Sequence, residues 1–501
     1  MNYTNFTLLD LFLSIGNLST LPECILIFSL ITVIVIDLSN KGKNTTLLYQ
    51  ISLISMLIGV VASLCQWGIQ FFLISFENSR ISNFSYIFRF LLLTCSILSV
   101  LLSIDYIRCS KMALAEFLFF ILTAGSGGMV LCWANDLATL YVALELSSLS
   151  SCFLSGHTKR DIRSNEATTK FILMGGASSS LLLYGFSLLY GISGGQLQLD
   201  KIASELPFSQ YFTVIYIAIA FITVGMAFKL SLVPFHQWTP DVYEGVPIPV
   251  VAFFSVTSKV AAPALFTRLF GLTFPYFSNE WHIVVGLLAT SSMIVGNLIA
   301  ITQISMKRML AYPSISQIGY ILIGVLAADP ENGYASMITY TFIYILMNLG
   351  TFARITSFGL RTGTDNIRDY AGLYMKDPVL TFSPVLRSPS LGGIPPPSGF
   401  FGKLYLFWHG WKAGLYPSVL VGLVTSVISI YYYLKIIKLM FTGKNGSSDA
   451  STTSIQNSLV SPSISISKSS IEIAMIIRAL ASILSGILID PIIGITRNTL
   501  F

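Results

Sequence analysis

Charged residues are scarce in this sequence. Only 10% of its 501 residues are Asp, Glu, Lys or Arg, and 54% are hydrophobic, whereas a soluble domain carries about 25% charged residues. The mean hydropathy of +0.75 excludes an ordinary soluble domain and predicts an all-α polytopic membrane protein. The net charge of +6 does not indicate nucleic-acid binding, because the basic residues are scattered through short connections rather than clustered on one face.

Motifs for nucleotides and metals are missing as well. The sequence contains no G-x-G-x-x-G or Walker motif, and its six cysteines form no C-x-x-C pair. This argues against an iron–sulfur cluster, a zinc site or a disulfide framework. We therefore expect no cofactor, metal or redox site on this chain. Residues 1–17 have no basic region and no small-residue cleavage site, so we expect no removable signal peptide.

Long hydrophobic runs fill the rest of the chain. A membrane span needs about 20 mostly apolar residues, and this criterion predicts about 14 transmembrane helices. They are residues 18–37, 47–75, 83–104, 112–133, 137–156, 169–192, 211–234, 246–268, 282–304, 308–328, 334–359, 379–408, 413–439 and 470–493. Two of these spans fit the criterion less well than the others: 83–104, which contains Arg89, and 379–408, which is rich in proline.

The basic residues predict the orientation of these spans. Most Lys and Arg fall in the odd-numbered connections, whereas the even-numbered connections hold only Arg80, Lys201, Arg268 and Lys412. Positive residues face the cytoplasm, matrix or stroma. We expect the odd-numbered connections on that side and both termini on the other.

Among the ionisable residues inside predicted spans, four stand out: Glu145, Lys229, Lys259 and Lys403. Each costs roughly 2.5–3.5 kcal/mol in hydrocarbon, and such residues usually mark an ion or proton pathway. We interpret these four as proton-transfer residues. The alternatives are a carboxylate that only joins helices at Glu145, and a lysine at Lys229 that extends to the membrane surface.

Two of these lysines lie beside helix-breaking residues. Pro234 follows Lys229, and Lys403 follows the run LGGIPPPSGFFG of residues 391–402. We expect helices 7 and 12 to be broken, and such paired breaks point to the pathway of a transporter. The spacing suggests two inverted five-helix repeats, with domains at 1–110 (three helices), 111–270 (first repeat), 271–440 (second repeat) and 441–501 (polar loop and last helix).

His236 lies just beyond Pro234. Histidine titrates near neutral pH, so His236 is a further candidate for proton transfer. The alternative is a hydrogen-bonded structural histidine.

Several runs resemble a known family. PFHQWTPDVYEG (234–245), SVTSKVAA (255–262), KRMLAYPSISQIGY (307–320) and SGFFGKLYLF (398–407) are similar to the antiporter-like subunits of complex I. Together with LPECILIF (21–28) and TGTDNIRDYAGLY (362–374), they resemble most closely the subunit-2 type of the plastid NAD(P)H–plastoquinone oxidoreductases.

The resemblance implies a proton-translocating subunit of a large membrane assembly in the chloroplast thylakoid. Glu145 would pair with Lys229, Lys259 would lie in the middle, and Lys403 would gate the opposite half-channel. Other subunits would use NAD(P)H or ferredoxin and plastoquinone. The alternatives are a stand-alone cation/proton antiporter of the same fold and an inert scaffold.

Some positions depart from this family, which has apolar or small residues there. They are Pro313, Arg354, Pro384, Arg387, Pro389, Pro397 and Arg478. Each differs from Leu, Ser, Cys or Trp by one C-to-T change in a codon. We therefore expect the messenger to be edited from C to U at these codons.

Overall fold

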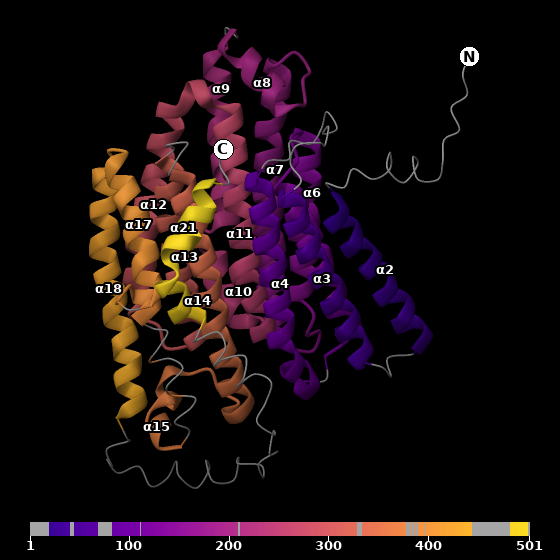
Figure 1. Cartoon of the computed structure of the whole chain (residues 1–501), viewed down its shortest axis with the longest axis vertical. Coiled ribbons are helices and arrows are strands. Elements are labelled where there is room, and N and C mark those ends of the chain that lie inside the picture. Colours follow the sequence, from indigo (N-terminus) through magenta and orange to yellow (C-terminus); the bar gives the residue numbers. More distant parts are fainter. Residues whose placement is uncertain are drawn as a thin grey trace.

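The computed structural model shows a bundle of long helices with most axes roughly parallel (Figure 1). It describes residues 20–40, 45–68, 83–110, 112–208, 211–327, 333–376, 389–395, 397–442 and 481–498, together with Thr381 and Val385. These residues form helices and connecting turns, with no β-strand among them. An all-α chain is expected here, because a helix satisfies its own backbone hydrogen bonds in a bilayer.

The helices follow one another with short connections. They are α2 (Leu21–Asn40), α3 (Thr45–Gly68), α4 (Asn83–Ser110), α5 (Leu114–Leu131), α6 (Leu137–Ser155), α7 (Ile162–Ile192), α8 (Leu199–Glu205), α9 (Phe212–Leu230), α10 (Trp238–Gly245), α11 (Ile248–Thr273), α12 (Ser278–Ala300), α13 (Met306–Leu326), α14 (Gly333–Thr362), α15 (Leu373–Lys376), α17 (Ser398–Lys412), α18 (Tyr416–Phe441) and α21 (Ile489–Asn498), with 3₁₀ turns at Leu206–Phe208, Pro275–Phe277 and Ile367–Tyr370.

Twelve helices in the described part are long and apolar enough to cross a membrane. They coincide with the first eleven predicted spans and the thirteenth, so the fold class is confirmed. The predicted spans at 379–408 and 470–493 lie partly outside the described residues. The four-part domain division stays a prediction.

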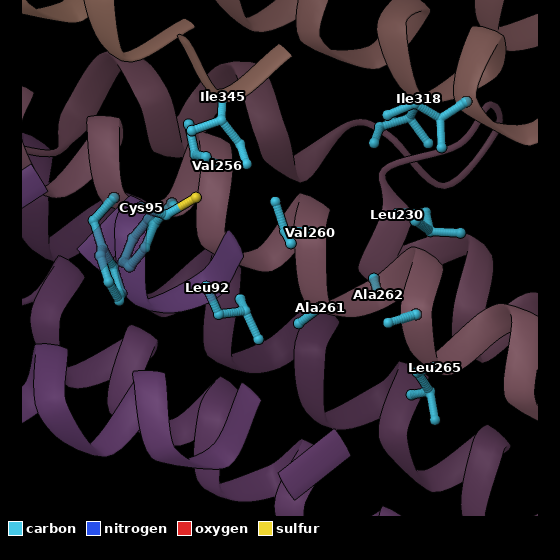
Figure 2. Packing of buried hydrophobic residues seen from close by; sticks show 14 of the residues in the cluster. Leu92, Cys95, Leu230, Val256, Val260, Ala261, Ala262, Leu265, Ile318 and Ile345 are labelled. Atoms are coloured by element: carbon cyan, nitrogen blue, oxygen red, sulfur yellow. The ribbon is translucent and has the colours of Figure 1, made fainter. Parts of the chain in front are cut away.

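Helix α11 lies at the centre of the bundle. Nearly all of its side chains are buried, as are most of those on α13 and α14, whereas α2, α3 and α18 expose many apolar residues. Figure 2 shows Val260, Ala261, Ala262 and Leu265 of α11 among buried side chains of other helices, which include Leu92 of α4 and Leu230 of α9. The peripheral helices therefore present the apolar surface that a bilayer would cover.

The span that contains Arg89 is stabilised by an ion pair. Arg89 Nε on α4 lies 3.0 Å from Glu23 Oε1 on α2. The same carboxylate oxygen accepts a 3.0 Å hydrogen bond from Trp133 Nε1, just after α5. Arg89 is fully buried. Its charge is compensated within the protein, which explains how this span tolerates an arginine.

Both predicted helix breaks are present. Helix α9 ends at Ser231, which has a left-handed backbone with φ of 60°, and α10 begins seven residues later at Trp238. In the second half, a helical turn ends at Gly393, with φ of +86°, before α17 begins at Ser398. A left-handed residue ends a helix and leaves carbonyl groups without intrahelical partners.

Candidate functional site

Lys229 lies in the last turn of α9, directly before the first break. It lines an internal cavity of about 80 Å³ together with Ser147 and Ser148 of α6 and Thr257 and Ser258 of α11. A buried water needs polar partners and roughly 10–15 Å³ of such space. The cavity is therefore large enough for a water molecule. Most of its lining is apolar, and its polar groups come from the four hydroxyl-bearing residues and Lys229.

Glu145 lies on the same polar stripe of α6. Its Oε2 is 3.4 Å from Ser148 Oγ, and its Oε1 has no hydrogen-bond partner. No ion pair within 4.0 Å joins Glu145 to Lys229 among the described residues. The expected pairing of Glu145 with Lys229 is therefore not a direct contact in this structure, and it stays a prediction. Ser148, which lies beside Glu145, lines the same cavity as Lys229.

Lys259 lies near the middle of α11 and is 1% exposed. Its Nζ donates a 2.7 Å hydrogen bond to Ser314 Oγ of α13. The aromatic ring of Tyr243 lies 5.9 Å away, within range of a cation–π contact. No described carboxylate lies within 4.0 Å of this amine. Its partners are a hydroxyl and a ring, both neutral.

A polar stripe on α13 continues from Lys259 toward Lys403. Its members are Ser314, Gln317 and Tyr320, spaced three residues apart, so they share one face of the helix. Gln317 Oε1 accepts a short hydrogen bond from the hydroxyl of Tyr340 on α14. The Lys403 Nζ lies 5.1 Å from the centre of the Tyr320 ring. This stripe joins the two lysines.

Lys403 on α17 points back to the second break. Its Nζ donates hydrogen bonds of 2.9 Å to the Leu391 carbonyl and 3.2 Å to the Gly392 carbonyl. The break explains both contacts, because it leaves these carbonyls without helical partners. A Cβ at Gly393 would lie 3.2 Å from Lys403 Cδ. Glycine therefore provides both the turn and the room for the lysine.

A second polar cluster lies beyond Lys403. The Tyr320 hydroxyl accepts a 3.2 Å hydrogen bond from Asn297 Nδ2 of α12 and lies 3.1 Å from Thr425 Oγ1 of α18. Asn297 Oδ1 accepts a further bond, of 3.1 Å, from the Tyr432 hydroxyl. These groups are buried and link three helices around the Lys403 end of the stripe.

His236 lies in the segment between α9 and α10. It is half-buried, and its Nδ1 has no hydrogen-bond partner. It does not line the cavity that contains Lys229. The structure places polar residues of α13 between Lys259 and Lys403, and it places Lys229 in a cavity lined by Thr257 and Ser258, close in sequence to Lys259. His236 stays a separate candidate.

Sequence reasoning missed the partners of the lysines. Ser314, Gln317 and Tyr320 fall within the run 307–320, but only their spacing of three marks them as one helix face. The partners Tyr340 and Asn297 lie on other helices, and nothing in the sequence shows which helices meet. Among the described residues, no group of three His, Cys, Asp or Glu side chains is placed to hold a metal ion.

Comparisons with known proteins agree with this geometry. Residues 134–429, more than half of the chain, match the family described as NADH:quinone oxidoreductase/Mrp antiporter, transmembrane. Residues 6–105 match the N-terminal segment of NAD(P)H-quinone oxidoreductase subunit 2.

Three solved structures are similar over almost their whole length. A chain of respiratory complex I from Thermus thermophilus has 27% identity and a TM-score of 0.76, covering 94% of this chain and 98% of its own. A chain of the archaeal membrane-bound sulfane sulfur reductase has 22% identity and a TM-score of 0.82, with 97% of each chain covered. A chain of the Mrp complex from Dietzia sp. has 20% identity and a TM-score of 0.81, again with 97% of each covered. The last two show the fold alone.

The broken helices, the buried lysines and the matched segments lead to one assignment. The chain belongs to the NADH:quinone oxidoreductase/Mrp antiporter family, as a membrane subunit whose N-terminal helices are of the NAD(P)H-quinone oxidoreductase subunit 2 type.

Proposed function

We propose that this chain moves protons across the thylakoid membrane within an NAD(P)H–plastoquinone oxidoreductase, through Glu145, Lys229, Lys259 and Lys403. One observation supports this most strongly: the Lys259 and Lys403 amines are buried and each meets neutral polar groups, while the partly buried Lys229 lines a cavity with four hydroxyl-bearing residues. Such groups are costly in a membrane interior unless they serve a pathway.

Proton transfer along this axis needs only small movements of side chains. A proton entering the Lys229 cavity meets Ser147, Ser148, Thr257 and Ser258, each of which can donate and accept a hydrogen bond. The hydroxyls of Thr257 and Ser258 now bond to carbonyls of their own helix. Rotation of such a hydroxyl, with water between, would carry the proton toward Lys259.

The second half of the path uses the stripe on α13. Lys259 donates to Ser314, so the proton would pass along Ser314, the Gln317–Tyr340 pair and Tyr320 to Lys403. Lys403 is held by two free carbonyls rather than by a carboxylate. It can therefore release a proton to the far side without separating an ion pair.

The redox chemistry belongs to other subunits in this proposal. NAD(P)H or ferredoxin would supply electrons and plastoquinone would accept them, and neither would be held by this chain. The chain would act as the translocase part of the enzyme, driven through neighbouring membrane subunits.

Replacing Lys229 or Lys403 by Met in the whole complex tests the proposal. We expect both variants to assemble but to lose proton pumping in sealed vesicles, because Met preserves the length of the side chain without the amine. Lys201→Met is the matched control, because Lys201 is exposed on α8.

Each result has a clear meaning. Normal pumping in both variants would favour the scaffold alternative and contradict the proposal. Cation/proton exchange by the purified chain alone would instead support a stand-alone antiporter.

A further inference from the structure

A second cavity opens at the ends of α5, α6 and α7. Its volume is about 560 Å³, and it is lined by Glu116, Phe120, Cys152, Phe153, Gly156, His157, Lys159, Asn165, Thr168, Thr169 and Ile172. We propose that Glu116 and His157 form the mouth through which protons enter toward Glu145 and Lys229. This inference rests on the proton-translocating function proposed above.

The two side chains are placed for successive steps of proton collection. The Glu116 side chain at the start of α5 is 51% exposed, whereas that of His157 is 2% exposed. His157 Nδ1 lies 3.6 Å from Glu116 Oε2, and the backbone of Ala113 also lies beside the imidazole. A buried imidazole next to an exposed carboxylate is suited to receive a proton from it.

Burial has the largest effect on the pKa of His157. It lowers this pKa and outweighs the opposing effects of Glu116 and of a hydrogen bond to the backbone of Ala113, while Lys159 lowers it further. The other titratable group in the cavity is Cys152 of α6, and α7 contributes the uncharged Asn165, Thr168, Thr169 and Ile172. A neutral imidazole can accept a proton at one nitrogen and release the proton of the other.

Helices α6 and α7 form the wall between this outer cavity and the inner cavity that Lys229 lines. Cys152 lines the outer cavity, and its neighbour Ser151 lines the cavity of Lys229. On α7, Ile172 lines the outer cavity and Phe171 the inner one. Adjacent residues differ by 1.5 Å along the helix axis, so the two cavities lie at nearly the same depth of these helices.

Hydroxyl groups continue inward from the outer cavity. Thr168, in its wall, lies 3.1 Å from Ser155 Oγ at the end of α6. Ser151 and Ser148 follow at turns of the same helix, and Ser148 reaches Glu145. Residues spaced by three and four share one helix face. The stripe from Ser155 to Glu145 therefore connects the mouth to the first proton-transfer residue.

The sidedness agrees with proton uptake. The connection that holds His157 also carries Lys159, Arg160 and Arg163, so it faces the positively flanked side of the membrane. In each cycle one proton from water binds Glu116, moves to His157 and leaves along the hydroxyl stripe. Both groups return to their starting forms, and no other reactant is consumed.

Two substitutions test the mouth in the reconstituted complex. We expect Glu116→Gln and His157→Gln to slow proton uptake from the positively flanked side by about tenfold. This is less than the loss of about 10²–10⁴-fold that is typical when an obligatory proton carrier is removed, because water can still reach the cavity. The loss should grow as that side is titrated from about pH 6 to about pH 9, because free protons become scarce. Glu116→Asp should retain most of the rate. A purely structural role would give the same loss at every pH.

Matched controls lie at the opposite end of the bundle. Glu280→Gln and His282→Gln at the start of α12 should leave the pH profile unchanged. If Lys229→Met stops pumping while Glu116→Gln and His157→Gln follow the wild-type pH profile, the proposed proton mouth is contradicted. The proposed proton-translocating function is then unaffected. If Lys229→Met pumps normally, the proposed function itself fails.

Thiol labelling gives a second readout that does not need an altered rate. Thr169→Cys places a thiol in the cavity wall. A charged, membrane-impermeant methanethiosulfonate added on the positively flanked side should block pumping faster in this variant than in the wild type, whose cavity wall holds the buried Cys152 as its thiol. Labelling that leaves pumping intact, or no labelling of the thiol in the assembled complex, would overturn the proposed mouth.

Discussion

The buried amines of Lys259 and Lys403 are bound by neutral groups. Lys259 donates to a serine hydroxyl and Lys403 to two backbone carbonyls, and aromatic rings lie over both. A buried carboxylate partner would hold an ammonium strongly, and separating such a pair costs several kcal/mol. Neutral partners stabilise each lysine and still allow a proton to move on.

The Gln317–Tyr340 contact gives the first prediction. Gln317→Leu should slow pumping about tenfold, because it removes the only described polar group of α13 between Ser314 and Tyr320 on the stripe. It also leaves the buried Tyr340 hydroxyl unpaired, at a cost of about 1–3 kcal/mol. Pumping by the reconstituted complex and its thermal stability measure the two effects.

Thr290→Val is the control, since Thr290 bonds only to carbonyls of its own helix α12. Wild-type pumping in Gln317→Leu would show that protons do not use this stripe.

Arg354 gives the second prediction, that of messenger editing. This side chain on α14 is 4% exposed, its Nε has no hydrogen-bond partner, and no described carboxylate lies within 4.0 Å. We therefore expect the mature protein to carry Cys or Trp at this position. Sequencing of the cDNA tests this, and an unchanged codon 354 would contradict it.

The other editing positions differ in what surrounds them. Pro313 lies within helix α13, whereas Pro397 caps the start of α17 with an extended backbone that suits proline. Pro389 lies in the turn before the second break. Pro384, Arg387 and Arg478 lie outside the described residues.

Among the elements, α5 and α6 approach each other very closely at Gly127. A Cβ at this position would lie 2.9 Å from the backbone nitrogen of Ser147 and 3.0 Å from the carbonyl oxygen of Ala143. Small residues allow such contacts between membrane helices. This packing fixes the part of α6 that carries Glu145.

Gly127→Val should therefore separate α5 from α6. We expect a loss of about 1–3 kcal/mol of stability and a fall in pumping, because the Glu145 stripe shifts. Thermal unfolding of the purified complex and its pumping rate check this. Gly175→Val on α7 is the control, since a Cβ there meets nothing within 4 Å. Equal effects of the two substitutions would contradict the prediction.

Helix α10 is fixed to two other helices by ion pairs. Asp241 lies 2.7 Å from Arg308 of α13 and 3.1 Å from Lys170 of α7, and Glu244 lies 3.3 Å from Arg308. Partial burial raises the pKa of Asp241, but the hydrogen bonds from Arg308 and Lys170 outweigh it and hold the pKa below its usual value. Arg308 of α13 therefore fixes α10 through two carboxylates.

A lowered pKa makes this contribution dependent on pH. The stabilisation is fully present above the unfolded-state pKa of about 3.9 and is lost as the pH falls through the lower folded-state pKa. At neutral pH, Asp241→Asn should lower stability by about 1 kcal/mol, since the site is partly exposed. Thermal unfolding of the wild type and the variant, at neutral pH and below about pH 4, measures this loss of stability. A difference between variant and wild type that persists undiminished in acid would contradict this assignment.

At the scale of the whole molecule, much of the fold could be predicted from the sequence. Hydrophobic length identified the spans, including the one with Arg89, and Pro234 and Gly393 marked the two breaks. These are local properties. The pairing of Arg89 with Glu23 and the stripe from Ser314 to Tyr320 depend on which helices meet, which one sequence does not show.

The candidate site was predicted in part for the same reason. The four charged residues are visible as exceptions within apolar runs, but the distance between Glu145 and Lys229 depends on the packing of α6 against its neighbours. His157 lies near a span end, where a histidine carries no special signal. Only the structure places it in a cavity with Glu116.

Pumping by a Lys259→Met complex tests the central claim most directly. Lys259 lies between the two breaks in the sequence, and its amine donates to Ser314 at the start of the polar stripe on α13. The measurement is the number of protons moved per electron in sealed vesicles, with assembly of the complex confirmed. We predict that the ratio falls well below that of the wild type, whereas an unchanged ratio would show that protons do not cross along this axis.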